Sequence, residues 1–141
     1  MNATIRQLLD TADLLLVGTG EPATPAATTV PARTVTLAAP AATTASRCRG
    51  VAFALRAALE SAVADCLTAN RAPRAIREGS RRAAFLWLRG CVEAGTARRA
   101  KAVWSQLCLG CHYHQYEIGP TEDQVRGWRT EVEAVVALLG H

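Results

Sequence analysis

The densest group of residues that could carry chemistry is Cys108-Leu-Gly-Cys111-His112-Tyr-His114. It places two thiols and two imidazoles, the preferred ligands of zinc, in one short segment. On a continuous helix Cys108, Cys111 and His112 share one face, whereas His114 points away from it. A helix break at Gly110 would let all four side chains surround one ion. The sequence therefore indicates Cys108, Cys111, His112 and His114 as candidate zinc ligands.

Other interpretations of this segment involve no metal. Cys108 and Cys111 continue the apolar stripe of Val103, Trp104 and Leu107, and free cysteine is among the most buried residue types. A c-type haem site is disfavoured, because that attachment needs export and no export signal is visible. A redox dithiol is also disfavoured, since such pairs normally lie at the start of a helix, where the thiol pKa is lowered.

A second candidate site is the basic stretch over residues 71–101. It holds nine basic residues against two acidic ones, a local charge of +7, whereas residues 102–141 carry −3. Guanidinium groups bind phosphates and carboxylates, so this stretch could contact an anionic partner. A solvated helix face explains the same pattern. The candidate anion-binding or nucleic-acid-binding residues are Arg74, Arg77, Arg81, Arg82, Arg98 and Arg99.

Catalysis is the function that the residue pattern favours least. The only histidines are His112, His114 and His141, and nothing arranges a nucleophile, a base and an orienting group. Glu131 and Glu133 face different sides of their helix, so they form no acid–base pair. We find no Gly-rich phosphate loop either. The sequence therefore leans towards a protein that is not an enzyme.

The elements that must position these residues are predicted to be helices. Half of the 141 residues are apolar, and Ala, Leu and Arg are good helix formers. Thr121 and Gln124 match a capping box at the start of the last helix. Trp87, Trp104 and Trp128 fall on predicted buried faces. Helices are predicted over residues 3–16, 48–69, 74–94, 97–110 and 121–139.

The predicted fold is all-α, with a four-helix antiparallel bundle behind a flexible N-terminal arm that carries one short helix. The arm comprises a short amphipathic helix over residues 1–17 and a linker over residues 18–46. This linker is rich in Pro, Ala and Thr and holds four of the six prolines, so it buries too little apolar surface to offset its ordering entropy. An island at Thr34–Leu37 alternates like a strand and is assigned to the linker. Residues 47–141 form the predicted bundle domain.

Three functions remain open at this point. The first is a non-catalytic binding or regulatory module whose basic face contacts an anionic partner, either nucleic acid or protein. The second is a small zinc site with a structural or sensing role. The third is an accessory protein that docks on a partner groove through its N-terminal helix, Ile5 to Leu16.

The sequence also indicates where the protein is located and whether it could assemble. No segment approaches the ~20 apolar residues that cross a bilayer, and the start does not resemble a signal peptide. We therefore expect a cytoplasmic protein that does not contact the membrane. In that reducing compartment the five cysteines are thiols or metal ligands. A homo-oligomer is compatible with the sequence.

Overall fold

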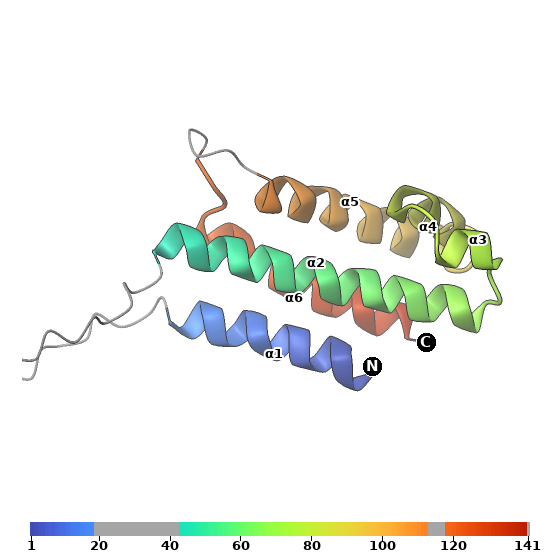
Figure 1. Cartoon of the computed structure of the whole chain (residues 1–141), viewed down its shortest axis with the longest axis horizontal. Helices are drawn as coiled ribbons and strands as arrows, with labels where there is room; N and C mark the ends of the chain where they lie inside the picture. Colours follow the sequence, from blue (N-terminus) through green and yellow to red (C-terminus); the bar gives the residue numbers. More distant parts are fainter. Residues whose placement is uncertain (19–42, 113–117, 141) are drawn as a thin grey trace, which may run out of the picture.

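The computed structural model describes residues 1–18, 43–112 and 118–140, and every regular element in these ranges is a helix. The all-α prediction is thus confirmed for this part of the chain. Figure 1 shows α1, α2, α5 and α6 running along the long axis of the molecule, with α3 and α4 at one end. The helices are α1 Ala3–Val17, α2 Thr44–Ala69, α3 Arg74–Arg77, α4 Arg81–Leu88, α5 Ala94–Cys111 and α6 Glu122–Leu139.

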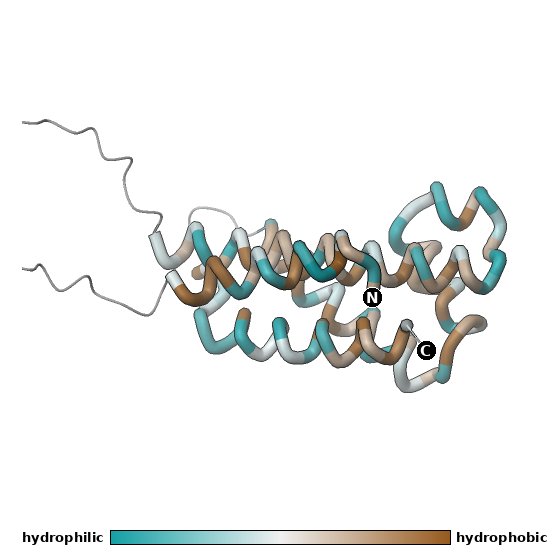
Figure 2. Tube along the Cα trace, turned by 90° about the horizontal axis from the view of Figure 1, so that it is seen from below, coloured by the Kyte–Doolittle hydropathy of each residue, from teal (hydrophilic) through white to brown (hydrophobic). Residues whose placement is uncertain are grey.

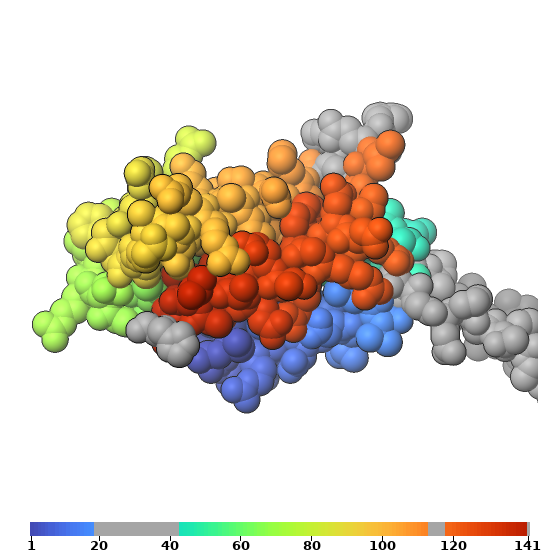
Figure 3. All heavy atoms as spheres, turned by 180° about the vertical axis from the view of Figure 1, so that it is seen from behind, coloured from blue at the N-terminus to red at the C-terminus, as the bar shows by residue number. Residues whose placement is uncertain are grey.

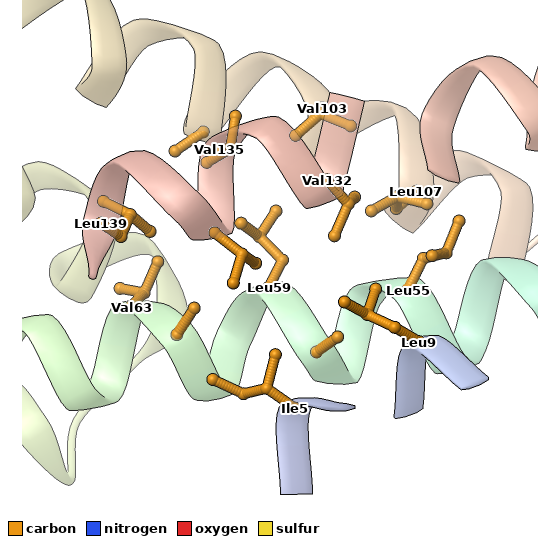
Figure 4. Packing of buried hydrophobic residues seen from close by; sticks show 14 of the residues in the cluster. Ile5, Leu9, Leu55, Leu59, Val63, Val103, Leu107, Val132, Val135 and Leu139 are labelled. Atoms are coloured by element: carbon orange, nitrogen blue, oxygen red, sulfur yellow. The ribbon is translucent and has the colours of Figure 1, made fainter. Parts of the chain in front are cut away.

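Helix α2 lies at the centre of the core and contacts every other helix. Its apolar residues recur every three or four positions, so they form one continuous buried stripe. Figure 4 shows side chains from α1, α2, α5 and α6 meeting in this core. Most of the buried residues are Ala, Val and Leu, whose small volumes let the helices approach closely.

Helix α1 belongs to this core and is not on a separate arm, which corrects the prediction for residues 1–17. Its stripe of Ile5, Leu9, Ala12 and Leu16 is buried against α2 and α6. Figure 3 shows α1, in blue, lying along α6. Arg129 of α6 donates two hydrogen bonds of 2.8 Å to the carboxylate of Asp13. The apolar face that we expected to dock on a partner is therefore already covered.

The helix predicted over residues 74–94 is broken, which is a second correction. Arg74–Arg77 forms the single turn α3, and α4 begins only at Arg81. Between them the hydroxyl of Ser80 accepts a hydrogen bond of 3.2 Å from the backbone N–H of Ala83 and caps α4. Ser is a strong capping residue, and Gly79 before it is a weak helix former, so a new helix starts here. Helix α1, not this segment, supplies the fourth long helix.

The boundaries of α5 and α6 show how caps set helix ends. Glu93 caps α5, because its carboxylate accepts hydrogen bonds from the backbone N–H groups of Gly95 and Thr96 at 2.8 and 3.0 Å. Helix α5 therefore begins three residues before the predicted start at residue 97. The capping box of Thr121 and Gln124 is confirmed at the start of α6. Caps satisfy backbone groups that the helix itself leaves unpaired.

The predicted linker over residues 18–46 lies largely outside the described residues, and so does the Thr34–Leu37 island. Its last residues belong to α2, which begins at Thr44 after the cap Thr43.

Figure 2 shows hydrophilic and hydrophobic positions interspersed along each long helix. Among the described residues, no helix combines the length and apolarity that a membrane crossing requires.

Candidate functional site

The Cys108–His112 segment forms the last turn of α5. The helix continues to Cys111 and His112 is its C-cap, so the chain does not show the break at Gly110 that would let all four candidate ligands surround one ion. Gly110 instead allows close packing, since a Cβ at this position would lie 2.8 Å from the ring of Trp128 on α6. The fourth candidate ligand, His114, lies outside the described residues.

Arg56 of α2 brings the other three candidate ligands together. Its Nη1 lies 3.2 Å from Nε2 of His112, which accepts the hydrogen bond. Its positive charge is also near enough to the thiols of Cys108 and Cys111 to act on the pKa of each. The same cation thus lies near all three residues and contacts His112 directly. Within the described part of the chain, no group of three or more His, Cys, Asp or Glu residues is arranged to hold a metal ion.

The two thiols of this segment behave as core groups. Burial is the main cause that raises the pKa of Cys108 and of Cys111, and the nearby charge of Arg56 only partly offsets it. Cys111 is fully buried and Cys108 is half-buried. Both thiols are therefore protonated at neutral pH, and a protonated thiol is a poor nucleophile and a poor metal ligand. The predicted continuation of the α5 apolar stripe into Cys111 is confirmed.

A partly buried carboxylate, Glu60, joins α2 to α4 and α5. Its Oε1 accepts a hydrogen bond of 2.9 Å from Nε1 of Trp104. Nε of Arg56 lies 3.4 Å from the same oxygen, and Nε of Arg81 lies 3.3 Å from Oε2. Only 16% of the Glu60 side chain is exposed, so its hydrogen bond and ion pairs take the place of most of the hydration that the carboxylate would have in water. Sequence analysis missed Glu60, although an Arg four residues earlier is a usable signal for an ion pair.

The six candidate anion-binding arginines lie on three helices rather than on one face. Arg74 pairs with Glu78 at 2.8 Å, and Arg81 pairs with Glu60. Arg99 donates two hydrogen bonds to Glu131, at 2.8 and 3.0 Å. The remaining three, Arg77, Arg82 and Arg98, are exposed. Nε of Arg77 donates a hydrogen bond of 3.1 Å to the backbone carbonyl of Ala72.

Trp87 is exposed, which corrects the prediction that all three tryptophans are buried. Helix α4 is short and buries only Ala84, Phe85 and Leu88. Trp87 projects beside this face and is 44% exposed, next to exposed Leu86. The two side chains line an open hollow of about 450 Å³, together with Asn70, Gly90 and Cys91.

Arginines flank this hollow on α4. Arg82, Leu86 and Arg89 are spaced at i, i+4 and i+7, so they lie along one side of the helix and its C-terminal end. Both arginines are exposed, and Leu86 lies between them in sequence. The end of the molecule formed by α3, α4 and the start of α5 therefore presents a hollow with two large apolar side chains and with positive charge beside it.

Comparisons with known proteins assign no family to the chain. No protein-family model matches it, and neither curated proteins nor solved structures give a significant match. Function is therefore inferred from the side chains described above.

Proposed function

We propose that this helical protein is a non-catalytic binding module, and that the end formed by α3, α4 and the start of α5 contacts an acidic segment of a partner protein. The observation that carries the proposal is the exposed hollow beside Trp87 within a strongly basic segment. Binding surfaces commonly combine an aromatic anchor with a charged rim. Arg82 and Arg89 supply the rim, and Leu86 and Trp87 supply the apolar centre.

The charge of this end supports an anionic partner. Residues 71–101 carry a net charge of +7, and the ion pairs that this segment makes on the surface are largely exposed. Exposed pairs are weak, so carboxylates of a partner can compete for the same guanidinium groups. A positive surface also steers an acidic partner during encounter, and salt screens this attraction.

A protein segment fits the geometry better than a nucleic acid does. Arg74, Arg81 and Arg99 already hold carboxylates of the same chain, so the candidate arginines form no continuous row for a phosphate backbone. The hollow is lined on one part by Leu86 and Trp87, which suit a hydrocarbon side chain, and on another by Asn70, which is polar. An acidic segment with one apolar residue matches both features.

The test uses a fluorescein-labelled, glutamate-rich peptide with one central Leu, and the same peptide with Ala in its place. We expect the Leu peptide to bind more tightly, and Trp87→Ala to remove the difference between the two. Reversing both rim charges, Arg82→Glu with Arg89→Glu, is expected to weaken binding by at least about tenfold. Fluorescence anisotropy at two salt concentrations measures the affinities.

A matched control is Arg6→Glu, an exposed position on α1. This variant changes the net charge by the same amount per residue but leaves the basic end intact, so we expect little loss of affinity. Equal losses per reversed charge for Arg6→Glu and for the double variant Arg82→Glu with Arg89→Glu would show that only net charge matters and would refute the proposal. Tighter binding to duplex DNA of matched charge than to the Leu peptide would favour a nucleic-acid partner instead.

Zinc binding by Cys108, Cys111, His112 and His114 is the alternative proposal, supported by the convergence of the first three residues at Arg56. It requires both thiols to lose protons and the guanidinium to move away, and each step costs free energy. Metal analysis of protein purified in reducing buffer distinguishes a zinc-bound protein from a metal-free one. About one zinc per chain, lost in Cys111→Ser, would establish the site, whereas no zinc in the wild type would refute it.

A further inference from the structure

The chain carries an acidic segment of its own, with one apolar residue, at the start of α6. In residues 118–123 the apolar residue is Ile118, and the carboxylates of Glu122 and Asp123 follow four and five residues later. Ile118 is 96% exposed, which makes it the most exposed large apolar side chain in the described part of the chain. Burying such a side chain against another apolar surface is favourable, because it removes that surface from water.

Both carboxylates of residues 118–123 are available to a partner. Asp123 is exposed and Glu122 is partly buried. The capping box at the start of α6 uses Thr121 and Gln124 instead of these two side chains. Among the described residues, neither carboxylate forms a salt bridge or accepts a hydrogen bond. Both can therefore pair with arginines of another molecule without breaking such a contact within the described part of the chain.

The hollow on α4 complements residues 118–123. Leu86 and Trp87 line it, and its volume of about 450 Å³ is enough for an isoleucine side chain. Arg82 and Arg89, here called the rim arginines, are exposed and form no ion pair with another described residue. Along the axis of α4 the rim arginines lie about 6 and 4.5 Å from Leu86, whereas four residues of extended chain reach about 13 Å. One segment can therefore fill the hollow and reach a rim arginine.

We propose that the partner of the proposed function, on which this inference rests, is a second copy of this chain. Residues 118–123 of one copy bind the α4 hollow of the other, with Ile118 against Trp87 and the two carboxylates at the rim arginines. Figure 1 shows α4 at one end of the long axis and the start of α6 at the other, so the two surfaces of one molecule do not meet. Contact between two different surfaces is heterologous, and each copy offers one of each kind.

The charge distribution favours this contact over other arrangements of two copies. The whole chain has a formal net charge of +4, so two copies repel each other overall. Residues 71–101 carry +7 and residues 102–141 carry −3, so the basic end of one copy attracts the acidic start of α6 in the other. Exposed ion pairs are weak and screened by salt, so we expect a weak association that salt dissociates.

The test is the mass of the full chain in solution, measured by sedimentation equilibrium over a range of protein concentrations. The head variant reverses the rim, Arg82→Glu with Arg89→Glu, and the tail variant reverses the segment, Glu122→Arg with Asp123→Arg. We expect the wild type to associate reversibly, and each variant alone to associate at least about tenfold more weakly. An equimolar mixture of the two variants should associate again, because each reversed surface then meets its complement.

The mixture separates binding from folding. A variant that failed to fold would not regain association when it is mixed with another variant, whereas complementary charges predict that it does. Ile118→Ser tests the apolar contact and should weaken association about tenfold, whereas Leu14→Ser, at an exposed position on α1, should not. Arg6→Glu is the control for a charge reversal away from both surfaces.

Failure of this inference differs from failure of the proposed function. If the wild type stays monomeric up to about 1 mM while the labelled Leu peptide binds the α4 hollow, the second copy is not the partner and the proposed function stands. If the wild type associates but the tail variant and Ile118→Ser associate as it does, residues 118–123 are not the contact and the inference is overturned. If the head variant changes neither association nor binding of the Leu peptide, both proposals are wrong.

Discussion

Replacing Leu9 by Ala tests whether α1 is an integral part of the core. Leu9 of α1 is 3% exposed on the face that packs against α2 and α6, whereas Leu14 on the same helix is 75% exposed. The two substitutions delete the same atoms from one helix, so they change helix propensity equally. Only the loss of packing distinguishes them, which makes Leu14→Ala a matched control.

The expected size of the effect follows from the buried atoms. Leu→Ala removes three carbons, and each buried methylene contributes about 0.8 kcal/mol, which amounts to about 2.4 kcal/mol. The cavity left behind adds to this loss, so we expect Leu9→Ala to lower the free energy of unfolding by about 3 kcal/mol. Leu14→Ala should change it by no more than about 0.5 kcal/mol.

Urea denaturation followed by circular dichroism measures these differences directly. For a chain of this length the entropy of unfolding is about 0.3 kcal/mol per kelvin, so Leu9→Ala should also lower Tm by about 10 °C. Equal stabilities of Leu9→Ala and Leu14→Ala would refute the packing of α1 on α2. That result would place the helix outside the cooperative core, on an arm as the sequence predicted.

Two further predictions concern helix packing and pH. Gly110→Ala should destabilise the protein by about 1–3 kcal/mol, because its Cβ would lie 2.8 Å from Trp128. Gly127→Ala should instead stabilise the protein by up to about 1 kcal/mol, because its Cβ meets no described atom within 4 Å. Thermal unfolding of both variants checks these opposite signs. The hydrogen bond from Arg99 lowers the pKa of Glu131 in the folded state. The pair therefore stabilises the fold at pH values above the unfolded-state pKa of Glu, and this stabilisation is lost as the pH falls through the lower folded-state pKa. The stability difference between wild type and Arg99→Ala should therefore vanish in acid, and a difference that persists there would contradict the assignment.

The sequence predicted helices where local signals are strong. The capping box at Thr121 and the apolar periodicity of residues 48–69 identified α6 and most of α2, since both patterns act within a few residues. The break before Ser80 was missed because apolar periodicity appeared to continue through it. The position of α1 was missed because the residues that cover its stripe lie far away in the sequence, on α2 and α6.

The candidate sites were less predictable than the helices. The types of residue in the Cys108–His114 segment indicated metal ligands, but the guanidinium that binds His112 and lies near both thiols comes from Arg56, on another helix. The exposure of Trp87 depends on where α4 ends, which the sequence placed six residues too late. Glu60 shows the same limit, because its hydrogen bond to Trp104 joins two helices whose packing no local pattern reveals.

The placement of the aromatic residues is a further argument for a binding function. Aromatic side chains make up only 5% of this chain, and burying them would add much to a core built from Ala, Val and Leu. Of the five aromatic residues that the structure describes, Phe85 alone is buried. Phe53 and Trp87 are the most exposed of the five, and each lies near arginines, on α2 and α4 respectively. The fold does not gain the free energy of burying these two rings, and contact with an apolar side chain of an acidic partner would bury them in the complex.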